Sequence, residues 1–137
     1  MDALANFLDR FPNATIDLAA RMTQVQAQST ADYAKVRGFM IKYQDRLLYG
    51  TDLTESPPDP AARAQNPPAT ADFAGEADAA WRSDWRYLAT ELDQEVPAIG
   101  ANAKGLALPR AVIDKIYYAN ARRVFHLDEQ AARNQAR

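Results

Sequence analysis

The carboxylate of Asp52 is the side chain in this sequence whose setting most suggests chemistry. In the stretch LLYGTDL, residues 47–53, apolar and aromatic residues run into Gly50 and Thr51, and the acid follows at once. Many α/β enzymes use a short buried strand with a turn at its carboxyl end to deliver a catalytic or metal-binding carboxylate. An Asp after Gly-Thr is also common in ordinary turns and helix starts. The spacing by itself favours that simpler interpretation.

Histidine and cysteine counts limit the other chemistry available. The chain contains one histidine, His126, near the C-terminus, and no cysteine. A histidine-rich metal site or a Ser-His-Asp triad would have only this imidazole to draw on. Disulfides, cysteine-ligated zinc and thiol catalysis are excluded. His126 is best interpreted as an exposed or helix-end residue, since an imidazolium is favourable near a helix C-terminus.

The composition is that of an ordinary globular domain. Hydrophobic residues make up 47% of the 137 residues and charged residues 25%. The net charge is −2 and the pI is near 5.3, which gives no electrostatic basis for binding nucleic acid or an anionic membrane. No apolar run approaches the roughly 20 residues of a membrane span, and the N-terminus lacks a signal-peptide pattern. We therefore expect a soluble, cytoplasmic protein, which the absence of cysteine also fits.

Two short strands with a helix between them organise the first half of the chain. Apolar residues at helical spacing predict a helix over residues 1–11, and the β-branched pair at residues 15–16 predicts a short strand. A helix over residues 31–44 follows, and DRLLYGTD, residues 45–52, contains the second strand. Strand–helix–strand order is typical of parallel sheets. Two strands are too few for a stable parallel sheet, which indicates that neighbouring strands are missing.

The second half is predicted to be a long loop followed by two helices. Residues 54–73 are rich in proline and poor in bulky side chains, which is typical of a long loop. In the helix predicted over residues 73–92, Trp81 and Trp85 lie four residues apart on one apolar stripe that continues to Leu88 and Leu92. Such a stripe is more typical of a packed helix face than of a ligand platform. An irregular connection from residue 97 then leads to the clearest predicted helix, over residues 109–125.

Four segments together resemble a known family. FPNATIDLAAR, KYQDRLLYGTDL, WRSDWRYLAT and GLALPRAVIDKIYYANARRVF resemble, in that order, the C-terminal part of the amidohydrolase-related family of metal-dependent hydrolases. The resemblance covers nearly the whole chain and is weakest in residues 54–73 and in the final dozen residues. It implies an α/β fold that is the C-terminal part of a TIM (β/α)8-type barrel, mostly helical. Residues 14–18 and 46–50 would be its seventh and eighth strands, in one partial domain over residues 1–137.

The resemblance also implies roles for individual residues. Asp52 matches the acid after the eighth strand, which in the family ligates a divalent metal, zinc in the usual case, and takes a proton from the metal-bound water. A bound cation lowers the pKa of water from about 15.7 toward ~7, so a nearby carboxylate can relay the proton. Asp17 and Arg21 would lie at and just beyond the seventh strand, where they could face a substrate carboxylate. An ordinary ion pair or cap is the better interpretation of these two.

The other metal ligands of the family come from strands that this chain lacks, and His126 matches none of them. Catalytic zinc sites use about three protein ligands, so we expect no metal to bind stably to this chain by itself. One hypothesis is that the chain belongs to an enzyme that hydrolyses or decarboxylates a small-molecule substrate, and is incomplete and inactive alone. The alternatives are a non-enzymatic remnant that self-associates through exposed strand edges, and an intact helical interaction module.

Overall fold

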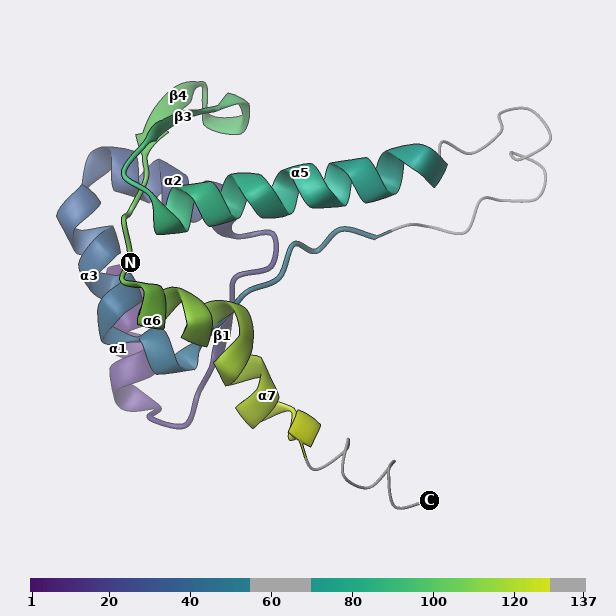
Figure 1. Ribbon diagram of the computed structural model, residues 1–137. Coiled ribbons are helices and arrows are strands. Elements are labelled where there is room, and N and C mark those ends of the chain that lie inside the picture. The colour runs from purple at the N-terminus through teal and green to yellow at the C-terminus, as the bar shows by residue number, and fades with distance from the viewer. Residues whose placement is uncertain (55–69, 129–137) are drawn as a thin grey trace, which may run out of the picture.

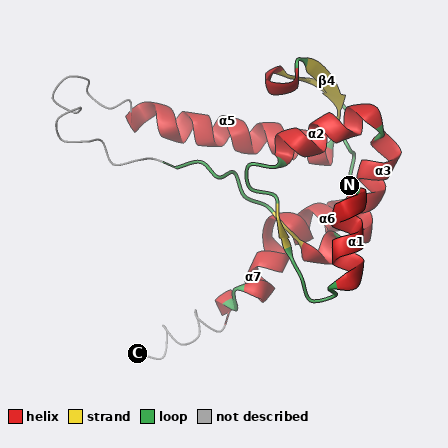
Figure 2. Cartoon of the chain, turned by 180° about the vertical axis from the view of Figure 1, so that it is seen from behind, coloured by secondary structure: helices red, strands yellow, loops and turns green. Residues whose placement is uncertain are grey.

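The computed structural model describes residues 1–54 and 70–128 of the chain. Helices predominate, and the strands are short (Figures 1 and 2). The elements, in chain order, are α1 Asp2–Arg10, β1 Ile16–Asp17, α2 Met22–Ala31, α3 Tyr33–Lys42, a 3-10 turn Gln44–Arg46, β2 Leu47–Leu48, α5 Thr70–Ala89, β3 Asp93–Val96, a 3-10 turn Pro97–Ile99, β4 Ala101–Lys104, α6 Arg110–Asp114, a π-helical segment Lys115–Ala119 and α7 Asn120–Val124.

The two predicted strands, β1 and β2, form a parallel pair. Ile16 pairs with Leu47 and Asp17 with Leu48, and the N–H of Leu18 continues the ladder with a 2.8 Å bond to the Leu48 carbonyl. The strand–helix–strand prediction is therefore confirmed, although both strands are shorter than expected. Among the described residues, neither β1 nor β2 pairs with a further strand.

Two helices, α2 and α3, connect β1 to β2, where the sequence predicted one. α3 begins two residues after the predicted start at residue 31, and the Asp32 side chain caps it by accepting a 3.0 Å bond from the N–H of Lys35. α2 was missed because part of its buried face is polar. Gln26 and Ser29 lie inside it together with Met22 and Val25, so the sequence shows no apolar helical period there.

The prediction that Trp81 and Trp85 form a packed face of the helix after the loop is wrong. Their side chains are 54% and 48% exposed, whereas Tyr87 and Leu88, in the last turn of α5, are fully buried. The N-terminal part of α5 extends away from the other helices (Figure 1). The predicted loop 54–73 lies mostly outside the described residues, and its last part, from Thr70, is helical.

Residues 93–104 form an antiparallel hairpin that the sequence analysis did not predict. β3 pairs with β4 from Asp93 with Lys104 to Val96 with Ala101, and Gly100 closes the turn with a left-handed φ of 62°. The strands are rich in Asp, Gln, Glu, Asn and Lys, which have low β-propensity. The described chain thus contains a second small sheet as well as the predicted parallel pair.

The helix predicted from residue 109 is present and carries a π-helical segment in its middle. It packs along β2, where Asn120, 2% exposed, donates bonds of 2.7 and 2.9 Å to the carbonyls of Gln44 and Leu47. The N–H of Tyr49 donates to the carbonyl of Ile116 at 3.0 Å. These bonds fix β2, and so the segment that follows it, to the C-terminal helix.

One continuous core joins these elements, and the carboxyl ends of both parallel strands lie at its edge. The core is formed by the buried apolar residues Leu8, Leu18, Met22, Val25, Val36, Phe39, Met40, Tyr43, Leu47, Tyr87, Leu88, Val96, Ala103, Leu106, Leu108, Val112, Ile113 and Ile116. Within residues 1–54 and 70–128, no helix has both the length and the apolar character that crossing a membrane requires.

Candidate functional site

The carboxyl ends of β1 and β2 touch each other. A Cβ atom added at Gly50, just beyond β2, would lie 3.1 Å from the Cβ of Ala19 and 3.3 Å from Oδ1 of Asp17. Parallel strands end at the same edge of a sheet, and a glycine lets the two exits approach this closely. The structure therefore brings the Asp17 turn next to the segment that carries Asp52.

We expect Gly50→Ala to destabilise the protein by about 1–2 kcal/mol, because the added methyl group overpacks this contact. Unfolding by urea, followed by circular dichroism, measures the change. Gly38→Ala is the matched control, since Gly38 lies within α3 and an added Cβ there meets nothing within 4 Å. Alanine should stabilise that helix by roughly 0.5–1 kcal/mol. Equal stability of the two variants would contradict the close contact.

Asp17 forms a turn and has no ion pair with Arg21. Its Oδ1 accepts a 2.7 Å bond from the N–H of Ala19, which confirms the interpretation as a local cap. Arg21 lies at the N-cap position of α2, and its guanidinium donates to the neighbouring Ala20 carbonyl at 3.4 Å. Neither residue takes part in a salt bridge among the described residues.

Asp52 is exposed and has a left-handed backbone, with φ of 60°. Asp is one of the few residues other than glycine that adopts this conformation readily. Beside it, the hydroxyl of Thr51 accepts a 3.4 Å bond from the N–H of Leu53. The local geometry is that of a turn that presents Asp52 to solvent at the carboxyl end of β2. Its role in a metal site stays a prediction.

The described residues do not by themselves fit a resident metal ion. Among residues 1–54 and 70–128, no group of three or more histidine, cysteine, aspartate or glutamate side chains is placed to hold one. Catalytic zinc sites need about three protein ligands. His126 lies just past the end of α7 and is exposed.

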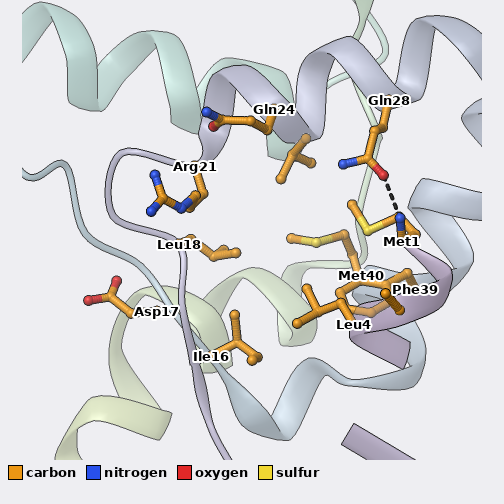
Figure 3. A pocket seen from close by; sticks show the side chains of 12 residues that line it. Met1, Leu4, Ile16, Asp17, Leu18, Arg21, Gln24, Gln28, Phe39 and Met40 are labelled. Atoms are coloured by element: carbon orange, nitrogen blue, oxygen red, sulfur yellow. Dashed lines mark hydrogen bonds between the residues drawn. The ribbon is translucent and has the colours of Figure 1, made fainter. Parts of the chain in front are cut away.

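An apolar cavity of about 320 Å³ lies between β1 and helices α1, α2 and α3 (Figure 3). Ile16, Asp17 and Leu18 are all among its lining residues, and the side chains of Ile16 and Leu18 point into it (Figure 3). Gln28 of α2 accepts a 2.5 Å bond from the N-terminal ammonium group at its rim. The cavity thus reaches from the helix-covered side of β1 to Asp17 and Arg21 at the exit of that strand.

A second group of polar side chains, Tyr49, Asp84 and Tyr117, lies at the exit of β2 and was missed by the sequence analysis. The Tyr49 hydroxyl donates to Oδ2 of Asp84 at 3.0 Å. The Tyr49 and Tyr117 rings stack with centroids 4.1 Å apart, and Trp81 lies 6.4 Å from Tyr117. The Tyr117 hydroxyl is buried and has no hydrogen-bond partner in the described residues.

Burial raises the pKa of all three titratable side chains in this group. It raises the pKa of the Asp84 carboxyl, against the lowering effect of the hydrogen bond from Tyr49. Burial also raises the pKa of both Tyr49 and Tyr117, so both phenols stay protonated at neutral pH. The nearby Tyr49 phenol also raises the pKa of Tyr117, although the two hydroxyls are not hydrogen-bonded to each other. The sequence held one signal for the inward position of Asp84, which lies four residues before Leu88 and therefore shares a helix face with it.

Comparison with known proteins gives one match. The model of a family described as amidohydrolase matches residues 1–127, which include both parallel strands and the C-terminal helix. No curated protein matches the chain, and no solved structure does.

Proposed function

We propose, because this chain belongs to the amidohydrolase family, that it is the C-terminal part of a metal-dependent, hydrolase-like enzyme. In this proposal Asp52 is the residue that the chain contributes to the metal site. The observation that carries the proposal is the family match together with the parallel β1–β2 pair, since Asp52 directly follows the carboxyl end of β2. Barrel enzymes form their active sites at that end of the strands.

The uncovered face of the parallel pair supports the idea that further strands complete the fold. Ile16 pairs with Leu47, which is fully buried, on the side of the helices. Successive side chains alternate between the two faces, so Asp17 and its partner Leu48 share the opposite face, and Asp17 is exposed. Parallel sheets are normally covered on both faces. In a closed barrel this exposed face would be the packed interior.

The reaction class follows from the family and not from this chain's own residues. We propose hydrolysis or decarboxylation of a small-molecule substrate, with a divalent metal, zinc in the first instance, bound by ligands from several strands. The described residues hold no group of three or more potential ligands, and in this proposal the other ligands come from polypeptide outside this chain. The chain by itself is then inactive, and it requires the remainder of the barrel for both metal binding and substrate binding.

The first experiment is to read the coding DNA upstream of Met1 in frame. We expect an open frame that encodes a His-x-His strand and two later histidines. The extended polypeptide should then bind one zinc ion per chain in equilibrium dialysis, whereas residues 1–137 should not. A stop codon with no such frame would overturn the proposal.

Substitution of Asp52 then tests its place in the site. In the extended polypeptide, Asp52→Asn should weaken zinc binding at least as much as loss of an outer-shell partner does, about 10- to 100-fold. Asp93→Asn is the matched control, since Asp93 is exposed on β3 and far along the chain from the strand exits. Competition with a chelator measures both affinities. Equal zinc affinity of the two variants would show that Asp52 is a turn residue only.

A second candidate function is self-association without catalysis, and the exposed tryptophans favour it. Trp81 and Trp85 line one surface hollow on α5 together with the ion-paired Asp78 and Arg82, and large exposed apolar patches often mark interaction sites. Sedimentation equilibrium separates the candidates. Concentration-dependent association of residues 1–137 that the upstream segment abolishes supports the barrel fragment. Association that persists in the extended polypeptide and is lost in Trp81→Ala supports self-association through this surface, and a stable monomer overturns it.

A further inference from the structure

Among the described residues, one side-chain hydrogen bond joins the exit of β2 to α5. β2 is followed by Tyr49, whose hydroxyl bonds Asp84 in α5 at 3.0 Å, and whose backbone N–H bonds the π-helical segment. A surface hollow is lined by Tyr49, Gly50 and Thr51 from the β2 exit and by Ala77, Asp78 and Trp81 from α5. The two segments therefore lie against each other where the chain turns toward Asp52.

Asp84 is an unusual residue for this place. It lies on the inner face of α5 with Ala77, Ala80 and Leu88, which are also wholly or partly buried, and it has no salt bridge among those of the described residues. A buried, unpaired carboxylate is costly unless it is protonated or fully hydrogen-bonded. An un-ionised carboxyl can accept the hydrogen bond from the Tyr49 hydroxyl on one oxygen and carry its own proton on the other.

We infer that Asp84 is a positioning residue, whose carboxyl, hydrogen-bonded to Tyr49 beside Tyr117, fixes the β2 exit and so the Gly50–Asp52 turn against α5. The unpartnered, buried hydroxyl of Tyr117 completes the group, stacked on Tyr49 from the C-terminal helix. Three elements far apart in the sequence thus meet at one cluster of polar and aromatic side chains. The inference goes beyond the proposed function and requires neither a metal nor a substrate.

The direction of the pH dependence follows from this arrangement. The titratable groups that face Asp84 are Tyr49 on the β2 exit and Tyr117 on the π-helical segment, and both remain protonated. Burial raises the pKa of Asp84 above its usual 3.8, so the folded protein holds this proton more tightly than the unfolded chain does. The stability should therefore fall as the pH rises from 3.8 through the raised pKa, and level off above it.

Trp81 provides a spectroscopic probe, because it lies 6.4 Å from the Tyr117 ring. The chain has two tryptophans, so the Trp85→Phe variant retains Trp81 alone. We expect its fluorescence to change with pH, with a midpoint clearly above 3.8. Asp84→Asn should abolish this transition and keep the low-pH signal, since the amide oxygen still accepts from Tyr49. Asp78→Asn, at an exposed site on the same helix, should leave it unchanged.

Tyr49→Phe separates positioning from a general loss of structure. It keeps the ring stack but removes the hydrogen bond that lowers the pKa of Asp84, so the fluorescence midpoint should move to higher pH. The amide proton of residue 49, which bonds the Ile116 carbonyl, should exchange at least ~10-fold faster in Tyr49→Phe, as expected for the loss of more than about 1.4 kcal/mol of local protection, and at the wild-type rate in Asp84→Asn. A transition that persists in Asp84→Asn, or unchanged exchange in Tyr49→Phe, would overturn the inference.

Discussion

Gly105→Ala is expected to prevent the chain from holding its native structure. An added Cβ would overlap the carbonyl oxygen of Thr90, and it would lie 3.0 Å from that carbonyl carbon and 3.1 Å from the carbonyl oxygen of Leu92. All three are backbone atoms, so no side chain can rotate away. Overpacking of a core typically costs about 1–3 kcal/mol and sometimes more. We expect at least the upper end of that range.

The backbone around Gly105 cannot move aside because it is tied down on both sides. The N–H groups of Gly105, Leu106 and Leu108 donate to the end of α5 and the residues after it, at 2.7 to 3.1 Å. The Gly105 carbonyl accepts from the Tyr33 hydroxyl at 3.1 Å. Any shift that relieves the clash would break several of these bonds at once.

Unfolding by urea, monitored by circular dichroism, measures this effect. A loss of the cooperative transition, or a midpoint lowered by an amount equivalent to about 3 kcal/mol, is expected for Gly105→Ala. Gly38→Ala is the control, because it places the same methyl group in open space on α3 and should be neutral or slightly stabilising. A Gly105→Ala protein as stable as wild type would show that residues 90–92 and 105 do not meet in this way.

Asn120→Ala is the second substitution with a large expected effect, about 2–4 kcal/mol of unfolding free energy. The amide of Asn120, 2% exposed, donates to two carbonyls, those of Gln44 and Leu47. Removing it leaves both without this donor, and a buried polar group without a partner costs about 1–3 kcal/mol. The bonded carbonyls flank the start of β2, so the parallel pair should loosen along with the global stability.

The Asn120 prediction is checked by urea unfolding and by amide exchange at Leu47 and Leu48. Asn6→Ala is the matched control, since Asn6 is exposed on α1 and should change stability by less than about 0.5 kcal/mol. Asn120→Asp is a stricter comparison, because it keeps the shape but replaces the donor with an acceptor, and it should be at least as harmful as alanine. If Asn120→Ala behaved like Asn6→Ala, the proposed fastening of β2 would be wrong.

Much of the local structure could be predicted from the sequence. The helices at residues 2–10, 33–42 and 110–124 carry apolar residues at helical spacing, and the two short strands between breakers pair in parallel as strand–helix–strand order indicates. α2 and the β3–β4 hairpin were missed because their residues have weak local preferences. Gln26 and Ser29 of α2 are buried through contacts such as the bond of the Tyr87 hydroxyl to Ser29, which only the folded chain provides.

The candidate site was predictable in part. The glycine turn after an apolar strand singled out Asp52, and the structure places it on an exposed turn beside the Asp17 turn. The contact of Asp84 with Tyr49 joins residues 35 positions apart. No spacing rule covers such a distance, because it depends on how α5 packs across the strand exit.

The sequence by itself determined the family, the parallel pairing and the place of Asp52 at a strand's carboxyl end, because each depends on residue type and on short, regular spacing. Only the tertiary structure decided which face of α5 is buried. Of the predicted stripe, Leu88 is fully buried, whereas Trp81, Trp85 and Leu92 are about half exposed. The partly buried Asp84 lies beside Leu88 on the face that meets the protein. A helix carries its side chains on every side, and the face that is buried depends on which neighbouring elements offer a matching surface.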